Sequence, residues 1–407
     1  MEQVETVIIG GGQAGLAMSS YLSQLDREHV IVDRARVAER WRTQRWDSLM
    51  FQFPYWSIEL PGRTYAGNDP DGFSHKNEVL KLIEDYSAWI KAPLRLGVNV
   101  LSLRSSASSS RYLLVTDRGS LGARNVVIAT GPYQRPRVPQ ISSSLPGDLV
   151  QLHASEYRNP GALPAGAVLV VGSGASGCQI AEELAEAGRR VYFSVGRHCR
   201  VPRRYRGRDV FWWRRALGHL DQTIDTTPIV QRMPAPLVTG VGGGHDIDIR
   251  RYAANGMTLL GKVRDVCDGR VALASDLEGS LRVGDQIFDD FKLAVDSYVR
   301  KSGIEAPPAQ DKSESDPVTT SAESIGEVDV RIAKISSVIW ATGYALDFGW
   351  VELPIFDALG HPVHRRGVTA APGSYLLGLA WLHKPKSSFL YGVGEDAEYL
   401  AERIERG

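Results

Sequence analysis

The stretch VETVIIGGGQAGLAMSSYL, residues 4–22, decides the fold. VETVII is an apolar run rich in β-branched residues, which is typical of a buried parallel strand. GGGQAG supplies Gly10, Gly12 and Gly15 in GxGxxG spacing, and the residues after it have helical periodicity. HVIVD, residues 29–33, predicts a second strand that ends in Asp33. Strand, glycine turn, helix, strand and acid together predict a dinucleotide-binding unit.

Each residue of this first turn has an expected task. Gly10 allows the tight turn, Gly12 lets the backbone approach a pyrophosphate, and Gly15 lets the helix pack close to the strand. The helix N-terminus favours the negative charge of the phosphates. Asp33 would accept a hydrogen bond from a ribose hydroxyl. The expected contacts of this turn also include Gln13, Ala14 and Arg34. A lone GxGxxG would indicate a tight turn only, but the full context favours a nucleotide.

The same pattern returns as AVLVVGSGASGCQIAEELA, residues 167–185. Its expected cofactor residues are Gly172, Gly174, Ala175, Ser176 and Gly177. The strand that follows, VYFSVGR, does not end in an acid: Ser194 stands at the offset expected for one, near Arg197. A carboxylate would repel a 2′-phosphate, whereas a guanidinium would pair with it. The second turn is therefore expected to bind NADPH, while the first could bind FAD or NAD.

Eight arginines crowd the stretch from 197 to 215. A solvated basic face and a nucleic-acid patch are the alternatives to phosphate binding. The chain has 47 basic and 47 acidic residues, so its net charge does not favour nucleic acid. We therefore expect phosphate binding, with Arg197 as the first candidate and Arg200, Arg203 and Arg204 behind it.

Two turns of different preference suggest that both dinucleotides bind together, with hydride transfer from a nicotinamide to a flavin. Two ATG sequences at strand ends support this interpretation: small residues there let the backbone pass close to a cofactor. They are Ala129, Thr130 and Gly131 in NVVIATG, and Ala341, Thr342 and Gly343 in SVIWATG. The alternative is that each ATG is only an ordinary end of a strand. The recurrence of ATG after both glycine turns makes this alternative less favoured.

With these motifs the chain resembles the class B flavin-dependent monooxygenases, the flavin-containing monooxygenase group, in particular its compact bacterial and YUCCA-like members. The likeness includes ERWRTQRWDSLMFQFP, residues 39–54. The resemblance implies a tryptophan after the ribose acid, here Trp41, and a flavin-lining segment at 45–49. The cofactor set expected beyond the two turns is Trp41, Arg42, Trp46, Ser48, Leu49 and Val100.

LHASEYRNP, residues 152–160, matches the histidine half of the family's FxGxxxH fingerprint through His153. Gly147 and Leu149 stand where the fingerprint has phenylalanine and glycine. We expect a linker role for His153, with direct chemistry as the alternative. No Ser-His-Asp set, carboxylate pair or metal-binding motif stands out, so no catalytic residue beyond the flavin is assigned.

The expected fold class is α/β, with two dinucleotide-binding Rossmann-like domains. An FAD domain would comprise 1–159 and 330–407, and an NADPH domain of 160–329 would be inserted in it. We expect an amphipathic helix over 283–303, on the surface or at a partner, which leaves a homodimer open. A loop is expected over 305–324 and a hairpin tip near 107.

The C-terminal stretch 373–404 predicts a strand, a polar loop and a helix. In flavoproteins of the kind that the resemblance implies, the last helix directs its N-terminus at the flavin. Leu390, Tyr391 and Gly392 are the candidates for that contact. His383, Lys384 and Lys386 either add positive charge there or form a solvated loop.

Three cysteines far apart, without a CxxC pair, predict no dithiol centre and fit a reducing cytoplasm. The N-terminus shows no signal-peptide pattern, and no run of about 18 apolar residues predicts a membrane span. The leading hypothesis is an NADPH-dependent FAD monooxygenase that acts with dioxygen, through a flavin C4a-(hydro)peroxide, on a nitrogen or sulfur of a small molecule. The alternatives are an NADPH-dependent reductase that serves a quinone or redox protein, and a flavoprotein sensor tied to a transporter.

Overall fold

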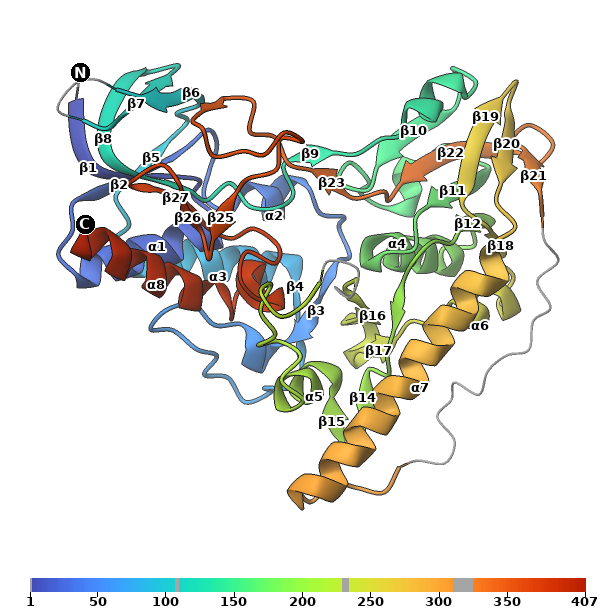
Figure 1. Ribbon diagram of the computed structural model, residues 1–407. Coiled ribbons are helices and arrows are strands. Elements are labelled where there is room, and N and C mark those ends of the chain that lie inside the picture. Colours follow the sequence, from blue (N-terminus) through green and yellow to red (C-terminus); the bar gives the residue numbers. More distant parts are fainter. Residues whose placement is uncertain (1, 107–109, 229–233, 310–324) are drawn as a thin grey trace.

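The computed structural model of the protein describes residues 2–106, 110–228, 234–309 and 325–407. Two sheets form the centres of two units that lie side by side (Figure 1). Each unit is built around one of the two glycine turns, which follow strand β1 (Glu2–Ile9) and strand β11 (Ala167–Val171). The predicted α/β class, with two dinucleotide-binding units, is confirmed.

The first sheet has ten strands. Its centre is parallel, because β1 pairs with β2 on one side and with β8 on the other, and β8 pairs in turn with β27. Val7 and Ile8 in β1 are fully buried, as a strand covered on both faces requires. The strands are β1, β2 (His29–Asp33), β5 (Leu94–Leu96), β6 (Val100–Ser105), β7 (Tyr112–Thr116), β8 (Gly119–Ile128), β24 (Val351–Glu352), β25 (His364–Arg365), β26 (Val368–Thr369) and β27 (Ser374–Leu376).

Three helices lie together beneath this sheet (Figure 1). They are α1 (Gln13–Gln24), α3 (Lys76–Trp89) and α8 (Val393–Arg406). Helices α1 and α8 pack against each other, so the C-terminal helix lies beside the helix of the first glycine turn. The predicted C-terminal strand, loop and helix are therefore confirmed as β27, a loop with the short 3-10 helix η6 (Pro385–Ser388), and α8.

The second sheet has five strands, all parallel. Helix α4 (Ala175–Glu186) packs on one face through Ile180 and Leu184. A three-stranded sheet covers the other face through Val271 and Val328. In sheet order the five strands are β10 (Val150–His153), β22 (Ile335–Trp340), β11, β12 (Val191–Ser194) and β18 (Thr258–Leu260); the covering strands are β19 (Val263–Cys267), β20 (Arg270–Leu273) and β21 (Glu327–Asp329).

Two strands of the second sheet lie outside the segment 160–329. Strand β10 precedes it and β22 follows it, and both pair in the second sheet. The chain therefore crosses between the units before β10 and after β22. The domain boundaries at 159/160 and 329/330 remain a prediction.

The predicted amphipathic helix is confirmed as α7, which begins at Leu277, before the expected start, and ends at Ser302. It buries Leu281, Phe288 and Val295 on one face and extends beyond the second sheet (Figure 1). Of the loop expected over 305–324, residues 310–324 lie outside the described residues, as does the hairpin tip at 107–109. Within the part of the chain that the structure describes, no helix is long and apolar enough to cross a membrane.

The remaining elements are short. Strands β3 and β4 form an antiparallel pair next to β16. The elements are α2 (Glu39–Thr43), β3 (Met50–Pro54), η1 (Tyr55–Ser57), β4 (Phe73–His75), β9 (Arg135–Pro136), η2 (Gln140–Ser144), η3 (Pro160–Ala162), β13 (Cys199–Arg200), β14 (Arg204–Tyr205), β15 (Arg208–Asp209), α5 (Val210–Ala216), β16 (Pro236–Thr239), η5 (Val241–Gly243), β17 (His245–Asp246), α6 (Ile249–Ala254) and β23 (Tyr344–Ala345).

Candidate active site

The first glycine turn leaves no room for side chains at two of its three motif positions. Gly10 has φ +119°, and a Cβ atom on it would lie 2.5 Å from the carbonyl oxygen of Ala129. A Cβ on Gly15 would lie 1.9 Å from the carbonyl oxygen of Gly10. At Gly12, by contrast, no described atom lies within 4 Å of the Cβ position. Gly10 and Gly15 are thus required by the fold, while Gly12 faces open space at the start of α1.

Asp33 is held beside this turn by backbone hydrogen bonds. Its Oδ2 accepts from the Gly11 N–H at 2.6 Å, and its Oδ1 accepts from the Ala35 N–H at 2.8 Å. A carboxylate can accept about four hydrogen bonds, so Asp33 keeps capacity for a ribose hydroxyl. Arg34 follows it on the exposed surface. Gln13, the first residue of α1, donates from Nε2 to the Ser388 carbonyl at 2.8 Å and so ties the turn to the C-terminal loop.

The second turn repeats the first in detail. Gly172 has φ +110°, and its Cβ would lie 2.6 Å from the carbonyl oxygen of Ala341. A Cβ on Gly177 would lie 1.9 Å from the Gly172 carbonyl oxygen. The Cβ position of Gly174 again has no described atom within 4 Å. Ala341 therefore closes the second turn as Ala129 closes the first.

Both helices that follow the turns fit a diphosphate group. Helices α1 and α4 each have 12 residues, and neither has an acidic residue in its first turn. Among the described residues, no side chain caps Gly12 or Gly174, so the backbone N–H groups there stay available. Gln13, Ala14, Ala175 and Ser176 form the two helix starts, with Ser176 exposed. FAD and NADPH both carry the diphosphate that such a turn accepts.

The register of the second sheet corrects the offset expected for Ser194. The Gly10 N–H donates to the Val32 carbonyl, and the Gly172 N–H donates to the Ser194 carbonyl. Ser194 thus corresponds to Val32, and Val195 takes the place of Asp33. Ser194 is buried and donates from Oγ to the Gly261 carbonyl at 3.0 Å. The position of the ribose acid is therefore apolar in the second unit.

The arginines after this strand differ in their surroundings. Arg200 is buried and pairs with Asp248 at 2.7 Å and Asp285 at 2.6 Å. Arg203 is 2% exposed and pairs with Asp209 at 2.7 Å. Both arginines form structural ion pairs. Their guanidinium groups, which the sequence suggested as further candidates for phosphate binding, are therefore already paired with carboxylates.

Arg204 is exposed and donates to the carbonyls of Gly243 and Gly244. Arg197 is exposed at the end of the β12 strand. Lys262, which sequence reasoning missed, follows β18, and its Cε lies 3.7 Å from the Cβ position of Gly196. Lys262 also pairs with Asp276 at 3.0 Å. Only the parallel pairing of β12 and β18 brings Lys262 next to Gly196, the residue before Arg197.

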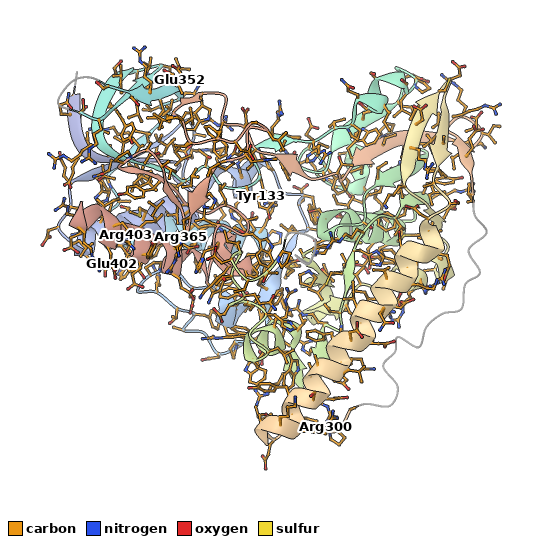
Figure 2. All side chains as sticks on the ribbon, viewed as in Figure 1. Tyr133, Arg300, Glu352, Arg365, Glu402 and Arg403 are labelled. Carbon is orange, nitrogen blue, oxygen red and sulfur yellow. The ribbon has the colours of Figure 1, made fainter. Side chains whose placement is uncertain are left out.

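The two ATG segments lead into connections that pair with each other. Strands β9 and β23 run antiparallel, with Tyr344 opposite Pro136. Gln134 donates from Nε2 to the Thr130 hydroxyl at 2.8 Å and to the Gly131 carbonyl at 2.9 Å, and its Oε1 accepts from the Asp347 N–H. The Thr342 hydroxyl donates to the Arg137 carbonyl. The crossings between the units are thus one double-stranded connection, with Tyr133 at the junction (Figure 2).

His153 anchors this connection. It is 2% exposed, and its Nδ1 accepts from the Ser155 N–H at 3.2 Å, which places the proton on Nε2. The Nε2–H donates to the Gly343 carbonyl at 3.0 Å. Burial lowers the pKa of His153 and keeps the ring neutral. This geometry supports the linker role expected for His153.

The segment expected to line the flavin lies between the two units. Trp41 packs against the cores of both. Trp46 and Leu49 are buried in the core of the second unit, and Ser48 donates to Glu183 of α4 at 2.6 Å. Arg42 pairs with Glu84 of α3. Trp46, Ser48 and Leu49 thus contact the second unit, and their role beside a flavin remains a prediction.

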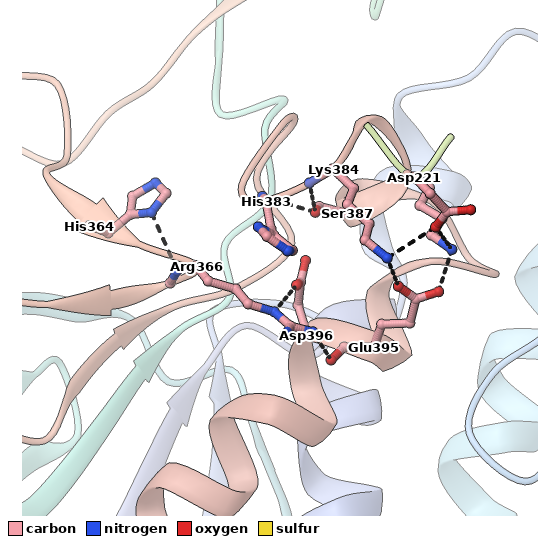
Figure 3. Close-up of polar contacts among 10 residues, drawn as sticks. Asp221, His364, Arg366, His383, Lys384, Ser387, Glu395 and Asp396 are labelled. Atoms are coloured by element: carbon pink, nitrogen blue, oxygen red, sulfur yellow. Dashed lines mark hydrogen bonds and ion pairs between the residues drawn. The ribbon is translucent and has the colours of Figure 1, made fainter. Parts of the chain in front are cut away.

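The C-terminal loop carries a network of four charges (Figure 3). Lys384 pairs with Asp221 at 3.0 Å and with Glu395 at 2.9 Å, and Lys386 contacts the same two carboxylates. Burial by itself would raise the pKa of Glu395, but the hydrogen bonds from both lysines hold this pKa below its usual value. Lys384 and Lys386 are therefore neutralised, which removes the extra positive charge that the sequence suggested.

The other C-terminal candidates divide between the two cores. Leu390 is buried in the core of the first unit, and Val100, at the start of β6, packs against the same core. Tyr391 packs against a separate cluster that includes Phe53 and Phe211. Gly392 precedes α8, and its Cβ would lie 2.2 Å from the Lys386 carbonyl oxygen. The loop is therefore closely packed at the start of α8.

The three cysteines are free. Burial raises the pKa of the thiols of Cys178 and Cys199. Asp268 raises the pKa of Cys267, which is exposed. A reactive thiolate needs a lowered pKa, so none of the three fits a thiol–disulfide reaction.

Comparison with known proteins agrees with the two glycine turns. The family model described as pyridine nucleotide-disulphide oxidoreductase matches residues 7–205. The flavin-containing monooxygenase of Stenotrophomonas maltophilia has a similar fold, with a TM-score of 0.69 and 19% identity over 100% of this chain and 99% of that one. An indole-3-pyruvate monooxygenase of the YUCCA group, from Oryza sativa subsp. japonica, is 29% identical over 45% of each chain.

The likeness to an oxidoreductase of Geobacillus kaustophilus named CzcO-like covers the whole length. The two are 34% identical over 406 residues, which is 98% of each chain. The chain therefore belongs to the family of the CzcO-like oxidoreductases, which is related to the class B flavin-dependent monooxygenases, and it is a flavin- and nicotinamide-dependent oxidoreductase.

Proposed function

We propose that the protein is an NADPH-dependent FAD monooxygenase that oxygenates a nitrogen or sulfur atom of a small molecule. One observation carries this proposal. Gly10 and Gly172 each meet the carbonyl oxygen of an ATG alanine, and Gly12 and Gly174 each face open space. Two turns of matching geometry, one in each unit, call for two dinucleotides. Oxygenation itself is supported by the relation to flavin monooxygenases.

The two turns differ at the residue expected to meet the ribose, and this difference supports a different cofactor for each. Asp33 in the first unit suits the ribose hydroxyls of FAD. In the second unit Val195 stands in that place, while Arg197 and Lys262 lie at the ends of adjacent strands. Two cations, with no acid in the place of Asp33, suit the 2′-phosphate of NADPH. Lys262 would exchange its partner Asp276 for that phosphate.

The chemistry belongs to the cofactors, and the protein orients them. When bound, FAD in the first unit and NADPH in the second would supply the hydride transfer and the oxygen activation that the reaction needs. The chain's own side chains contribute an apolar cluster. Phe53 stacks on Phe211 at 4.2 Å between ring centroids and lies 5.0 Å from Phe389. These rings belong to one apolar cluster built from three segments far apart in the chain, and apolar surroundings protect reactive species from hydrolysis.

An NADPH-dependent reductase is the second candidate. The match to the pyridine nucleotide-disulphide oxidoreductase model favours it. The thiols weigh against disulfide reduction, because Cys178 and Cys199 are buried with raised pKa values. A reductase would therefore pass its electrons to a quinone or a redox protein.

A stopped-flow experiment tests the proposal. The purified protein is reduced with NADPH and mixed with dioxygen while its visible and near-ultraviolet spectra are recorded. We expect a transient near-ultraviolet band, and transfer of labelled oxygen from dioxygen to an added amine or sulfide. Direct reoxidation with release of hydrogen peroxide, without the band, would establish the reductase. A colourless protein that takes up no FAD would refute both.

We also propose that the protein works in the cytoplasm and that the NADPH unit is inserted in the FAD unit. Three free cysteines suit the reducing cytoplasm, where NADPH is at hand. The sequence leaves a homodimer open, and light scattering of the purified protein measures it. The insertion of the NADPH unit in the FAD unit is tested by limited proteolysis, which cuts first at the domain boundaries.

A further inference from the structure

Both cations proposed for the 2′-phosphate come directly after a glycine. Arg197 follows Gly196, and Lys262 follows Gly261. The two glycines lie just beyond strands β12 and β18, which run side by side (Figure 1). The Cε atom of Lys262 lies 3.7 Å from the Cβ position of Gly196. The backbone of each glycine therefore sets the point from which the next side chain, a cation, extends.

A buried serine hydroxyl holds each of these glycines. Ser173 accepts from the Gly196 N–H at 2.8 Å and donates to the Gly196 carbonyl at 3.2 Å. Ser194 donates to the Gly261 carbonyl at 3.0 Å. Ser173 lies inside the second glycine turn, and Ser194 is the last residue of β12. One hydroxyl thus connects the turn to the first loop, and the other connects the first strand to the second loop.

The His198 ring adds a second hydrogen bond to the Gly196 carbonyl. A carbonyl oxygen only accepts, so Nδ1 of His198 carries the proton of this 3.0 Å contact. The ring is buried, and a Cβ on Gly284 of α7 would lie 2.3 Å from its Nε2 atom. Burial lowers the pKa of His198, so the ring adds no charge to the loop. The loop that carries Arg197 is therefore held from the glycine turn and packed against α7.

The first turn makes the corresponding connection with a charged group. Gly11 and Asp33 stand there where Ser173 and Val195 stand in the second unit. The Asp33 carboxylate accepts from the Gly11 N–H at 2.6 Å. In the second unit the connecting side chain belongs to the turn instead, and it is a neutral hydroxyl. The end of β12 is thus held to the turn without a negative charge that would repel a 2′-phosphate.

We infer that Ser173 and Ser194 are positioning residues that make the second turn select NADPH over NADH. They hold the backbone of Gly196 and Gly261, and this backbone directs the two cations that follow at the 2′-phosphate. The inference rests on the proposed function, because it takes the second turn as the NADPH site. NADH has no 2′-phosphate and makes no use of these cations. The loss of either hydroxyl should therefore weaken the binding of NADPH and leave that of NADH unchanged.

Binding of the oxidised nucleotides measures this selection without turnover. The FAD-containing protein is titrated by isothermal calorimetry with NADP⁺ and, separately, with NAD⁺. We expect the original protein to bind NADP⁺ at least about tenfold more tightly, the size of a charge-assisted contact. Ser173→Ala should lower this preference about fivefold, the size of one hydrogen bond, through weaker binding of NADP⁺ alone. Ser194→Ala should lower it less, because the Asp276 carboxylate also holds the Lys262 N–H, at 3.1 Å.

Two other serines serve as matched controls. Ser176 lies in the same turn, where we expect the diphosphate that both nucleotides share, so Ser176→Ala should weaken both equally and keep the preference. Ser337 is a buried serine of β22 in the same sheet, and Ser337→Ala should keep the preference as well. Equal weakening of both nucleotides in Ser173→Ala would overturn the inference, because a merely structural hydroxyl gives that result. The same loss of preference in Ser337→Ala would also overturn it.

The outcomes separate this inference from the proposed function. A preference for NADP⁺ that Ser173→Ala and Ser194→Ala both keep would refute the inference and leave the NADPH site standing. Equal binding of both nucleotides by the original protein would refute the NADPH site and the inference with it. Loss of the preference in the variants of a protein that lacks the near-ultraviolet band would support the inference and refute the monooxygenase. Circular dichroism shows whether each variant is folded, and Ser173→Gly, which restores the glycine of the first turn, repeats the test if Ser173→Ala does not fold.

Discussion

The carbonyl oxygen of Ala129 lies 2.5 Å from the point that a Cβ atom on Gly10 would occupy. Ala341 and Gly172 repeat this relationship at 2.6 Å in the second unit. In both units the strand that leaves the sheet therefore closes the glycine turn, which accounts for the ATG sequence at each strand end. The same contact between an ATG carbonyl and the first glycine of a turn thus occurs in both units, as expected for two dinucleotide sites in one chain.

Two glycine variants should separate folding from cofactor binding. Gly10→Ala combines a left-handed φ of +119° with a backbone clash, and we expect it to lower the free energy of unfolding by about 2 kcal/mol or more. Gly12→Ala has φ −90° and open space, so the apoprotein should stay within about 1 kcal/mol of the original. Its FAD content should nevertheless fall, as measured by visible absorbance per protein. A fully yellow Gly12→Ala variant would contradict the pyrophosphate assignment.

The 2′-phosphate assignment predicts a selective kinetic effect. Arg197→Gln and Lys262→Gln should each raise the KM for NADPH about tenfold or more and leave the KM for NADH nearly unchanged, because a charged contact contributes about 1.5–3 kcal/mol. Lys301→Gln, at the exposed end of α7, is the control. Equal effects on both nucleotides would show that these residues do not read the phosphate.

Arg200 should behave in the opposite way, although it lies in the same arginine-rich stretch. It is 5% exposed at its side chain and pairs with Asp248 and Asp285. Arg200→Gln leaves the buried Asp248 without its ion-pair partner, whereas Asp285 keeps Arg250, and the change should cost about 3–5 kcal/mol of stability. Chemical denaturation measures this loss. An Arg200→Gln variant of normal stability with a raised KM for NADPH would overturn its structural role.

His153 predicts a dependence of stability on pH. Burial lowers its pKa, so the unfolded chain binds a proton near pH 6.5 that the folded chain does not. The contribution of His153 to stability is therefore full above about pH 7 and declines as the pH falls below about 6.5. Several other histidines have lowered pKa values, so the slope is compared between the original protein and His153→Gln. Identical slopes would show that His153 is not neutral and buried in the fold.

The charge network at the C-terminal loop predicts an acid-sensitive contribution. Burial would raise the pKa of Glu395 and of Asp221, but hydrogen bonds from the lysines lower both pKa values. Their contribution is present above about pH 4.5 and is lost as the pH falls through the lowered values. Glu395 is 40% exposed, so we expect only about 1 kcal/mol from Glu395→Gln at neutral pH. Glu402→Gln, in an exposed pair on the same helix, should cost less.

Local sequence was enough for the two glycine turns and the strands beside them. The steric demands on Gly10 and Gly15 come from residues close in the chain or from the adjacent strand, so their spacing carries the information. The same holds for α7, whose buried residues Leu281, Phe288 and Val295 follow helical spacing. The offset at Ser194 was wrong by one residue, because Asp33 lies 23 residues after Gly10, and 23 residues after Gly172 comes Val195.

What the sequence by itself determined is the class of fold and the kind of cofactor, because both depend on short patterns of backbone conformation. Only the tertiary structure decided which arginines are held in buried ion pairs. Arg200 resembles its neighbours in sequence, but Asp248 and Asp285, far along the chain, neutralise it. Charge and burial are long-range properties, and they depend on partners that no local pattern contains.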